Sequence, residues 1–293
     1  MCFDLKKIIS HNIFVLKKAN TRHIMFDFDE EELIRYSRHI LLKDVGVEGQ
    51  EKIRNAKVLV VGAGGLGSPI ILYLAAAGIG TIGIIDADIV DLSNLQRQII
   101  YTTQDVGLSK ALIAQQKVKA LNPHVNTVVY QDFIRANNAL DIIKEYDFVI
   151  DGTDNFPAKF LVNDACVMLG KPFSFAGILG FDGQLFTHVP GSSCYRCIYN
   201  TPPEPNSIPS CSQAGVVGAV VGILGTIQAT ETIKYFAGIG ELLINKLFVI
   251  DAKSMNFNKI DVRIDDNCPI CGNNKTITKL IEYQQNSCEL KKH

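Results

Sequence analysis

The stretch that decides the fold covers residues 57–91 and reads KVLVVGAGGLGSPIILYLAAAGIGTIGIIDADIVD. A short β-branched run, residues 58–61, leads through a glycine cluster into a small-residue apolar helix, and a second apolar run ends at Asp86. This order predicts one strand–helix–strand unit with a phosphate-binding turn. The turn satisfies the G-x-G-x-x-G spacing with Gly62, Gly64, Gly65 and Gly67. Backbone N–H groups can approach a phosphate there because no Cβ is in the way.

Asp86 closes the second predicted strand, where a carboxylate can accept hydrogen bonds from ribose hydroxyls. A lone glycine motif is weak evidence, but strand, helix, second strand and acid together indicate a nucleotide site. The alternative is a tight packing turn that holds no ligand.

Strands and helices alternate up to Gly170, which predicts a doubly wound, Rossmann-like, mainly parallel sheet of the α/β class. After Gly170, two strands follow each other around Gly183 without a helix between them, so we expect antiparallel strands to extend the sheet. The predicted segments are helices at 29–46, 49–55, 109–121, 139–144 and 214–236, and strands at 58–61, 125–130, 148–150, 173–180, 184–189, 247–250 and 259–264.

Composition excludes several classes of protein. The 293 residues are 47% hydrophobic and 20% charged, as in an ordinary globular protein. Basic and acidic residues balance at 29 and 30, which disfavours nucleic acid as the main partner. Apolar runs are short or interrupted by glycine, and no secretory signal is evident, so we expect a cytoplasmic protein without a membrane span. We expect a poorly ordered N-terminal tail at 1–27, one domain at 28–272 and a polar C-terminal tail at 273–293.

Four of the eight cysteines form two C-x-x-C pairs, Cys194 with Cys197 and Cys268 with Cys271. Two such pairs predict a four-thiolate zinc site of the structural type, with no open position for catalysis. Disulfide bonds are the alternative, which the absence of a secretory signal disfavours.

Cys211 stands apart from these pairs, after a proline-containing loop and before a predicted helix N-terminus. A helix dipole favours the thiolate form there, so an exposed reactive cysteine is one interpretation. A small residue that packs at the end of the loop is the other.

Charged residues in the loops after the predicted strands suit a nucleotide that lies on the glycine turn. Arg97 and Lys110 are candidate phosphate ligands, and Asp154 is a candidate ligand for a magnesium ion that bridges phosphates. Each could singly be an ordinary surface residue, but jointly they favour a site.

The motifs GAGGLG, SNLQRQ, DGTDN, CYRC and CPICG follow one another along the chain, which thereby resembles the ThiF/MoeB/HesA family of ubiquitin-activating-like adenylyltransferases over residues 28–272. The resemblance implies an ATP-dependent enzyme that adenylates the C-terminal glycine of a small ubiquitin-like sulfur-carrier protein and releases pyrophosphate. The site residues it implies are Asp86 on the ribose, Arg97 and Lys110 on the phosphates, Ser93, Asn94 and Asn155 near the nucleotide, and Asp154 on Mg²⁺.

The resemblance also implies partners. Arg38, in RYSRHI, matches an arginine that reaches the ATP of a neighbouring subunit, so we expect a homodimer. In some members of the family a cysteine at the position of Cys211 forms a covalent link with the activated carrier. A separate desulfurase or rhodanese would supply the sulfur.

The carrier itself is not determined by these motifs. We favour a MoaD-type carrier of molybdopterin synthesis; a ThiS-type carrier of thiamine-thiazole synthesis and a tRNA-modifying relative are alternatives within the family. A nicotinamide-dependent oxidoreductase and a catalytically inactive scaffold are alternatives from other classes.

Overall fold

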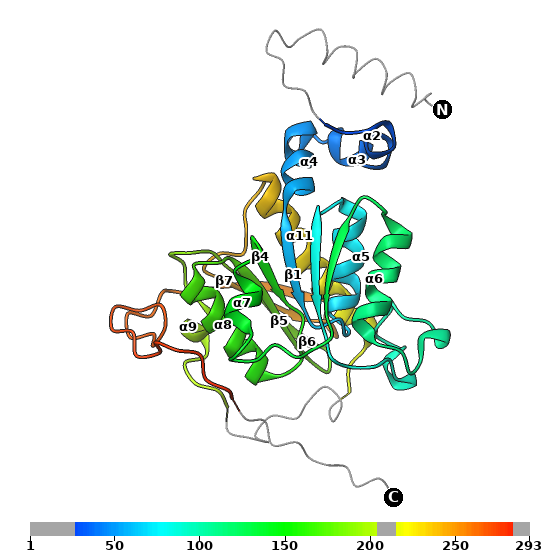
Figure 1. Cartoon of the computed structure of the whole chain (residues 1–293). Coiled ribbons are helices and arrows are strands. Elements are labelled where there is room, and N and C mark those ends of the chain that lie inside the picture. The colour runs from blue at the N-terminus through cyan, green and yellow to red at the C-terminus, as the bar shows by residue number, and fades with distance from the viewer. Residues whose placement is uncertain (1–26, 204–214, 284–293) are drawn as a thin grey trace, which may run out of the picture.

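The computed structural model describes residues 27–203 and 215–283, which form one eight-stranded sheet in the order β3-β2-β1-β4-β5-β6-β7-β8 (Figure 1). The first five strands in sequence run parallel, and β6, β7 and β8 pair antiparallel. The α/β class and the antiparallel extension are therefore confirmed. The strands are β1 Lys57–Val61, β2 Thr81–Ile85, β3 Asn126–Tyr130, β4 Phe148–Asp151, β5 Phe173–Leu179, β6 Asp182–His188, β7 Lys246–Asp251 and β8 Asn256–Asp261.

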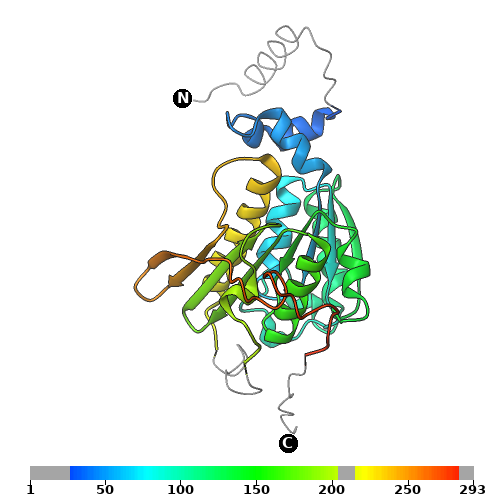
Figure 2. The ribbon, with the colours of Figure 1, turned by 90° about the vertical axis from the view of Figure 1, so that its left-hand side faces the viewer.

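Helices cover both faces of the parallel part of the sheet, and each layer buries its own hydrophobic cluster (Figures 1 and 2). One layer holds α5 Gly67–Ala77, α6 Lys110–Leu121 and α11 Gly218–Ala237. The other holds α7 Ala139–Ile143, α8 Phe156–Leu169 and α9 Tyr195–Ile198. The short helices α2 Glu30–Arg35, α3 Ser37–Ile40 and α4 Gly46–Asn55 precede β1, and η1 Leu92–Asn94 and η2 Thr103–Asp105 lie between β2 and α6.

The central unit forms because its apolar residues are buried from both sides. In β1, every residue after Lys57 is buried, and β2, β4 and α5 supply the neighbours. Ile70 and Leu74 of α5 are fully buried, and each such side chain contributes about 1.5–3 kcal/mol. The helix ends at Gly78, whose φ of 82° is the left-handed conformation that glycine adopts readily.

Some predicted boundaries differ from the structure. The helix predicted at 29–46 is interrupted at Tyr36, which is buried and held by a hydrogen bond from Asn122 Nδ2 to its hydroxyl at 2.8 Å. The last strand lies at Asn256–Asp261, earlier than the predicted 259–264. Helix α8 had no prediction of its own. Residues 1–26 lie outside the described part of the chain, and no helix within that part is long and apolar enough to cross a membrane.

Candidate functional site

A cleft of about 1370 Å³ opens at the carboxyl ends of β1, β2 and β4. In a parallel α/β sheet this edge is where ligands bind, because the loops that follow the strands converge there. The cleft is lined by most of the residues predicted to bind the nucleotide: Gly62, Gly64, Gly65, Asp86, Arg97, Lys110, Asp154 and Asn155. The structure thus brings together residues from three connections, those that follow β1, β2 and β4.

The glycines of the turn serve two different purposes. Gly62 has a φ of +90°, and a Cβ at Gly67 would lie 2.0 Å from the carbonyl oxygen of Gly62, so these two glycines allow the turn to close. Gly64 has only the Gln98 amide near its Cβ position, at 3.7 Å, and both Gly64 and Gly65 line the cleft. The open side of the turn therefore faces the cleft, at the N-terminus of α5, where an anion is favoured.

Asp86 is held in place by backbone hydrogen bonds to both of its oxygens. Oδ2 accepts from Ala63 N at 2.7 Å, and Oδ1 accepts from Asp88 N at 2.8 Å. Burial raises the pKa of the carboxyl group, and the nearby Lys110 ammonium opposes that shift. The carboxylate links the glycine turn to the end of β2 and lines the cleft as an acceptor.

The loop after β2 presents Arg97 through contacts made by its neighbours. Asp91 Oδ1 accepts from the backbone and hydroxyl of Ser93 at 2.8 and 2.6 Å, and Asn94 Oδ1 accepts from Asp91 N at 3.2 Å. Arg97 Nη1 donates to Ser93 O at 3.0 Å. Arg97 lines the cleft, whereas Ser93 and Asn94 do not, so in this structure these two residues shape the loop that carries the arginine.

Lys110 is a nearly buried cation, with its side chain 7% exposed, and it pairs with Asp88 at 2.9 Å. The Tyr101 hydroxyl lies 2.8 Å from Ala63 O and 3.2 Å from Lys110 O, which connects the glycine turn to the start of α6. Burial raises the pKa of Tyr101, so the phenol stays protonated and can donate. Tyr101 was not predicted as a site residue, because nothing in its local sequence marks it.

The loop after β4 contains two aspartates in different environments. Asp151 is buried, accepts from Thr153 N and Oγ1, and pairs with Lys159 at 3.0 Å. Asp154 is exposed at the cleft, and the structure gives it no hydrogen bond or ion pair to any described residue. Asn155 accepts from Ala158 N at 2.9 Å and caps α8. Asp154 is therefore the carboxylate of this loop that remains available to a ligand.

Lys159 is the other residue of this region that sequence reasoning missed. Besides Asp151, its ammonium donates to Thr153 O at 2.8 Å and Ala176 O at 2.6 Å. Its position in the first turns of α8 gives no signal in the sequence, since the partners come from β4 and β5.

Arg38, another predicted site residue, lies away from the cleft. Arg38 is exposed on α3, and α4 then leads into the first residue of β1, so α3 lies near the amino ends of the strands (Figure 1). Arg38 does not line the cleft of its own chain. Cys211 lies outside the described residues.

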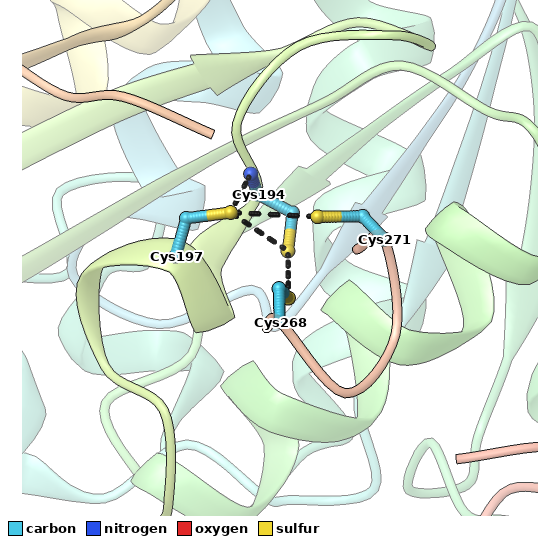
Figure 3. A group of neighbouring side chains, drawn as sticks. All are labelled: Cys194, Cys197, Cys268 and Cys271. Carbon is cyan, nitrogen blue, oxygen red and sulfur yellow. Dashed lines mark hydrogen bonds between the residues drawn. The ribbon is translucent and has the colours of Figure 1, made fainter. Parts of the chain in front are cut away.

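The four paired cysteines converge from two segments distant in sequence (Figure 3). Sulfur atoms lie 3.6 Å apart for Cys194 and Cys268, 3.4 Å for Cys197 and Cys271, and 4.0 Å for Cys194 and Cys197. These four thiols are not joined by disulfide bonds. A tetrahedral ion with metal–sulfur bonds of 2.3 Å places its ligands about 3.8 Å apart, so the cluster fits a metal. The amide of Asp265 also donates to Cys197 Sγ at 3.5 Å.

The ThiF family model matches residues 36–270. A sulfur carrier protein adenylyltransferase of Thermus thermophilus is 46% identical over 261 residues, which cover 87% of this chain and 96% of that protein. The probable adenylyltransferase/sulfurtransferase MoeZ of Mycobacterium tuberculosis is 45% identical over 260 residues; this match covers 87% of this chain but only 65% of MoeZ. A crystal structure of E. coli MccB with ATP is similar with a TM-score of 0.73 and 26% identity, over 90% of this chain and 81% of MccB. On the strength of the family match and of these relatives, the chain belongs to the ThiF family.

Proposed function

We propose that this protein uses ATP to adenylate the C-terminal glycine of a small ubiquitin-like sulfur-carrier protein, with release of pyrophosphate. The observation that carries the proposal is the cleft that joins the open glycine turn, Asp86, two cations and an aspartate with no ion-pair partner among the described residues. The names of the Thermus and Mycobacterium relatives support adenylyltransferase activity, and the MccB structure with ATP supports a nucleotide in this cleft.

In this mechanism the glycine turn and the N-terminus of α5 bind phosphate oxygens, and Asp86 accepts from the ribose hydroxyls. The carboxylate of the carrier attacks the α-phosphorus, and the bond from that phosphorus to its bridging oxygen breaks. The electron pair leaves with pyrophosphate, and no proton is transferred. The nucleophile is already ionised, so the cleft needs positioning and charge neutralisation, which Arg97 and Lys110 supply, rather than a general base.

Two metal ions belong to the proposal. Asp154 would hold Mg²⁺, which would supply positive charge to neutralise the phosphates. The four cysteines would hold a structural Zn²⁺, since four thiolates in this arrangement leave no position for water. Zn²⁺ would then fix the loop around α9 to the C-terminal loop that carries Cys268 and Cys271.

The carrier we favour is of the MoaD type, which would place the protein in molybdopterin synthesis with a separate sulfur donor. A ThiS-type carrier, a tRNA-modifying role and an inactive partner-binding scaffold remain the alternatives. We further propose a cytoplasmic homodimer, and Cys211 as a thiol able to bond covalently to the activated carrier.

ATP–pyrophosphate exchange tests this function. The wild-type protein should exchange label with one intact carrier, MoaD-type or ThiS-type, and not with the same carrier lacking its terminal glycine. Arg97→Ala and Asp154→Asn should each lower exchange by about 100- to 1000-fold. Their controls, Arg263→Ala and Asp141→Asn, change exposed residues that do not line the cleft and should leave exchange unchanged. Carrier binding without any exchange would support the scaffold instead.

The position of Arg38 provides a separate test of the homodimer. Arg38→Ala and Lys110→Ala should each abolish exchange, because each site would lack one cation. If a site combines Lys110 of one subunit with Arg38 of the other, an equal mixture of the two variants should recover about a quarter of the wild-type sites after subunit exchange. A mixture that stays inactive would contradict the shared site.

A further inference from the structure

The described residues after the fourth cysteine, up to Tyr283, pack against the body of the protein. In Figure 1 the red C-terminal part of the described chain passes α9 and α8. Leu280 and Tyr283 pack against the hydrophobic cluster beneath α8. Glu282 Oε2 accepts from Ala136 N at 2.9 Å, in the loop after β3. We refer to residues 280–283 as the C-terminal strap.

Tyr283 is anchored by a buried ion pair. Arg196 of α9 donates to both oxygens of Asp164 of α8, at 2.7 and 2.9 Å. The Tyr283 hydroxyl donates to Asp164 Oδ2 at 3.1 Å and accepts from Arg196 Nη2. The ring of Tyr283 lies 5.9 Å from that of Phe160. A half-buried tyrosine with both of these charged partners holds its ring in one orientation.

Both Glu282 and Tyr283 line the same cleft as the glycine turn and Asp86. The order of the strands gives the direction of a bound nucleotide. The glycine turn follows β1, Asp86 follows β2, and β3 is the next strand outward. Phosphates on the turn and a ribose at Asp86 therefore direct the base towards the loop after β3, where Glu282 binds Ala136.

The cleft is aromatic at that end. Phe133, in the loop after β3, is 50% exposed and lines the cleft, with the Arg135 guanidinium 5.5 Å from its ring centre. Tyr283 of the strap also lines the cleft, and its ring packs against Phe160 of α8, which is fully buried. Aromatic faces with a few polar groups are the usual surroundings of a nucleobase, because the base is flat and largely apolar on its faces.

We propose that the C-terminal strap forms the outer wall of the base-binding end of the cleft, with the ring of Tyr283 against the base and Glu282 holding the loop after β3. This inference rests on the proposed ATP-dependent function, and it adds a contact from residues beyond the 36–270 that match the family model. The strap thereby determines how tightly the base end of a purine nucleotide is bound.

Calorimetric titration of the full chain with two ligands, in the absence of any carrier, tests this wall. The ligands are Mg·ATP and Mg·tripolyphosphate, which has the phosphates but neither ribose nor base. Tyr283→Ala should weaken ATP binding by about tenfold, as loss of one aromatic contact to a base does, and should leave tripolyphosphate binding unchanged. Glu282→Ala, which leaves the Tyr283 anchor intact, should weaken ATP binding in the same selective way. Lys279→Ala, an exposed neighbour that does not line the cleft, is the control.

Each outcome has one meaning. Selective loss of ATP binding in either variant supports the wall. Unchanged ATP binding in both variants would overturn it, and so would an equal loss for both ligands, because that indicates distortion of the whole cleft. A wild-type protein that binds neither ligand would overturn the proposed function itself.

Discussion

The ion pair between Asp164 and Arg196 allows a quantitative test of how α9 and its cysteines are attached to the body. The two side chains are 1% and 3% exposed, and the guanidinium makes two short hydrogen bonds to the carboxylate. Asp164→Asn keeps the size of the side chain but removes its charge. The guanidinium of Arg196 then stays buried without a counter-ion. The new amide N–H₂ group can also face the N–H donors of that guanidinium, and two donors cannot hydrogen-bond to each other.

Removal of one partner from a buried ion pair costs about 3–5 kcal/mol, and we expect Asp164→Asn to lower the free energy of unfolding by that amount. The exposed pair Lys144–Asp141 is the matched control. Its atoms also approach to 2.7 Å, but its side chains are 52% and 78% exposed. Asp141→Asn should therefore leave the free energy of unfolding nearly unchanged, because water screens an exposed ion pair.

Equilibrium urea unfolding of the zinc-supplemented protein measures both values. A double variant, Asp164→Leu with Arg196→Met, removes the buried cation as well and should regain most of the lost stability, because an apolar pair needs no counter-charge. A cost for Asp164→Asn no larger than that for Asp141→Asn would refute the reasoning. A double variant less stable than Asp164→Asn alone would show that the cost does not come from the unpaired guanidinium.

Three further predictions concern other parts of the structure. Gly67→Ala should lower the melting temperature, because its Cβ would lie 2.0 Å from Gly62 O, whereas Gly64→Ala should leave the melting temperature unchanged and weaken ATP binding in the calorimeter. Burial lowers the pKa of His188 in the folded state, so its contribution to stability is complete above the unfolded pKa of about 6.5 and is lost as the pH falls below it. The melting temperature should therefore depend less on pH between about pH 5 and 8 in His188→Gln than in the wild-type protein. Cys268→Ala should reduce bound zinc, measured by mass spectrometry, from about one ion per chain to background and lower the melting temperature.

The central unit could be predicted from sequence because its determinants are local. The strand, the glycine turn, the helix and Asp86 follow one another in residues 57–91, and the structure brings the turn and Asp86 together through the hydrogen bond to Ala63. The cysteine cluster was predictable for a similar reason. The spacing within each C-x-x-C pair places two of the four sulfur ligands close together. Only the contact between the two pairs therefore depended on the fold.

Contacts between distant segments could not be predicted in this way. The break at Tyr36 depends on Asn122, which follows α6, and the C-terminal segment appeared only as a polar tail although Tyr283 reaches Asp164 of α8. Neither partner carries a local pattern that points to the other. Hydrophobic periodicity also failed to separate α8 from the strands around it, because α8 is buried along most of its length.

The two aspartates of DGTDN differ in burial, and this difference separates a structural charge from a candidate functional one. Both follow β4 within one short motif, and residue type alone cannot assign their roles. A buried carboxylate needs a counter-charge or several donors, and Asp151 has Thr153 and Lys159. Asp154 needs none of these, since it is exposed at the cleft and water can solvate it. Asp151→Asn should consequently destabilise the fold, whereas Asp154→Asn should leave stability unchanged and lower ATP–pyrophosphate exchange by about 100- to 1000-fold. A large loss of stability in Asp154→Asn would contradict this division of roles.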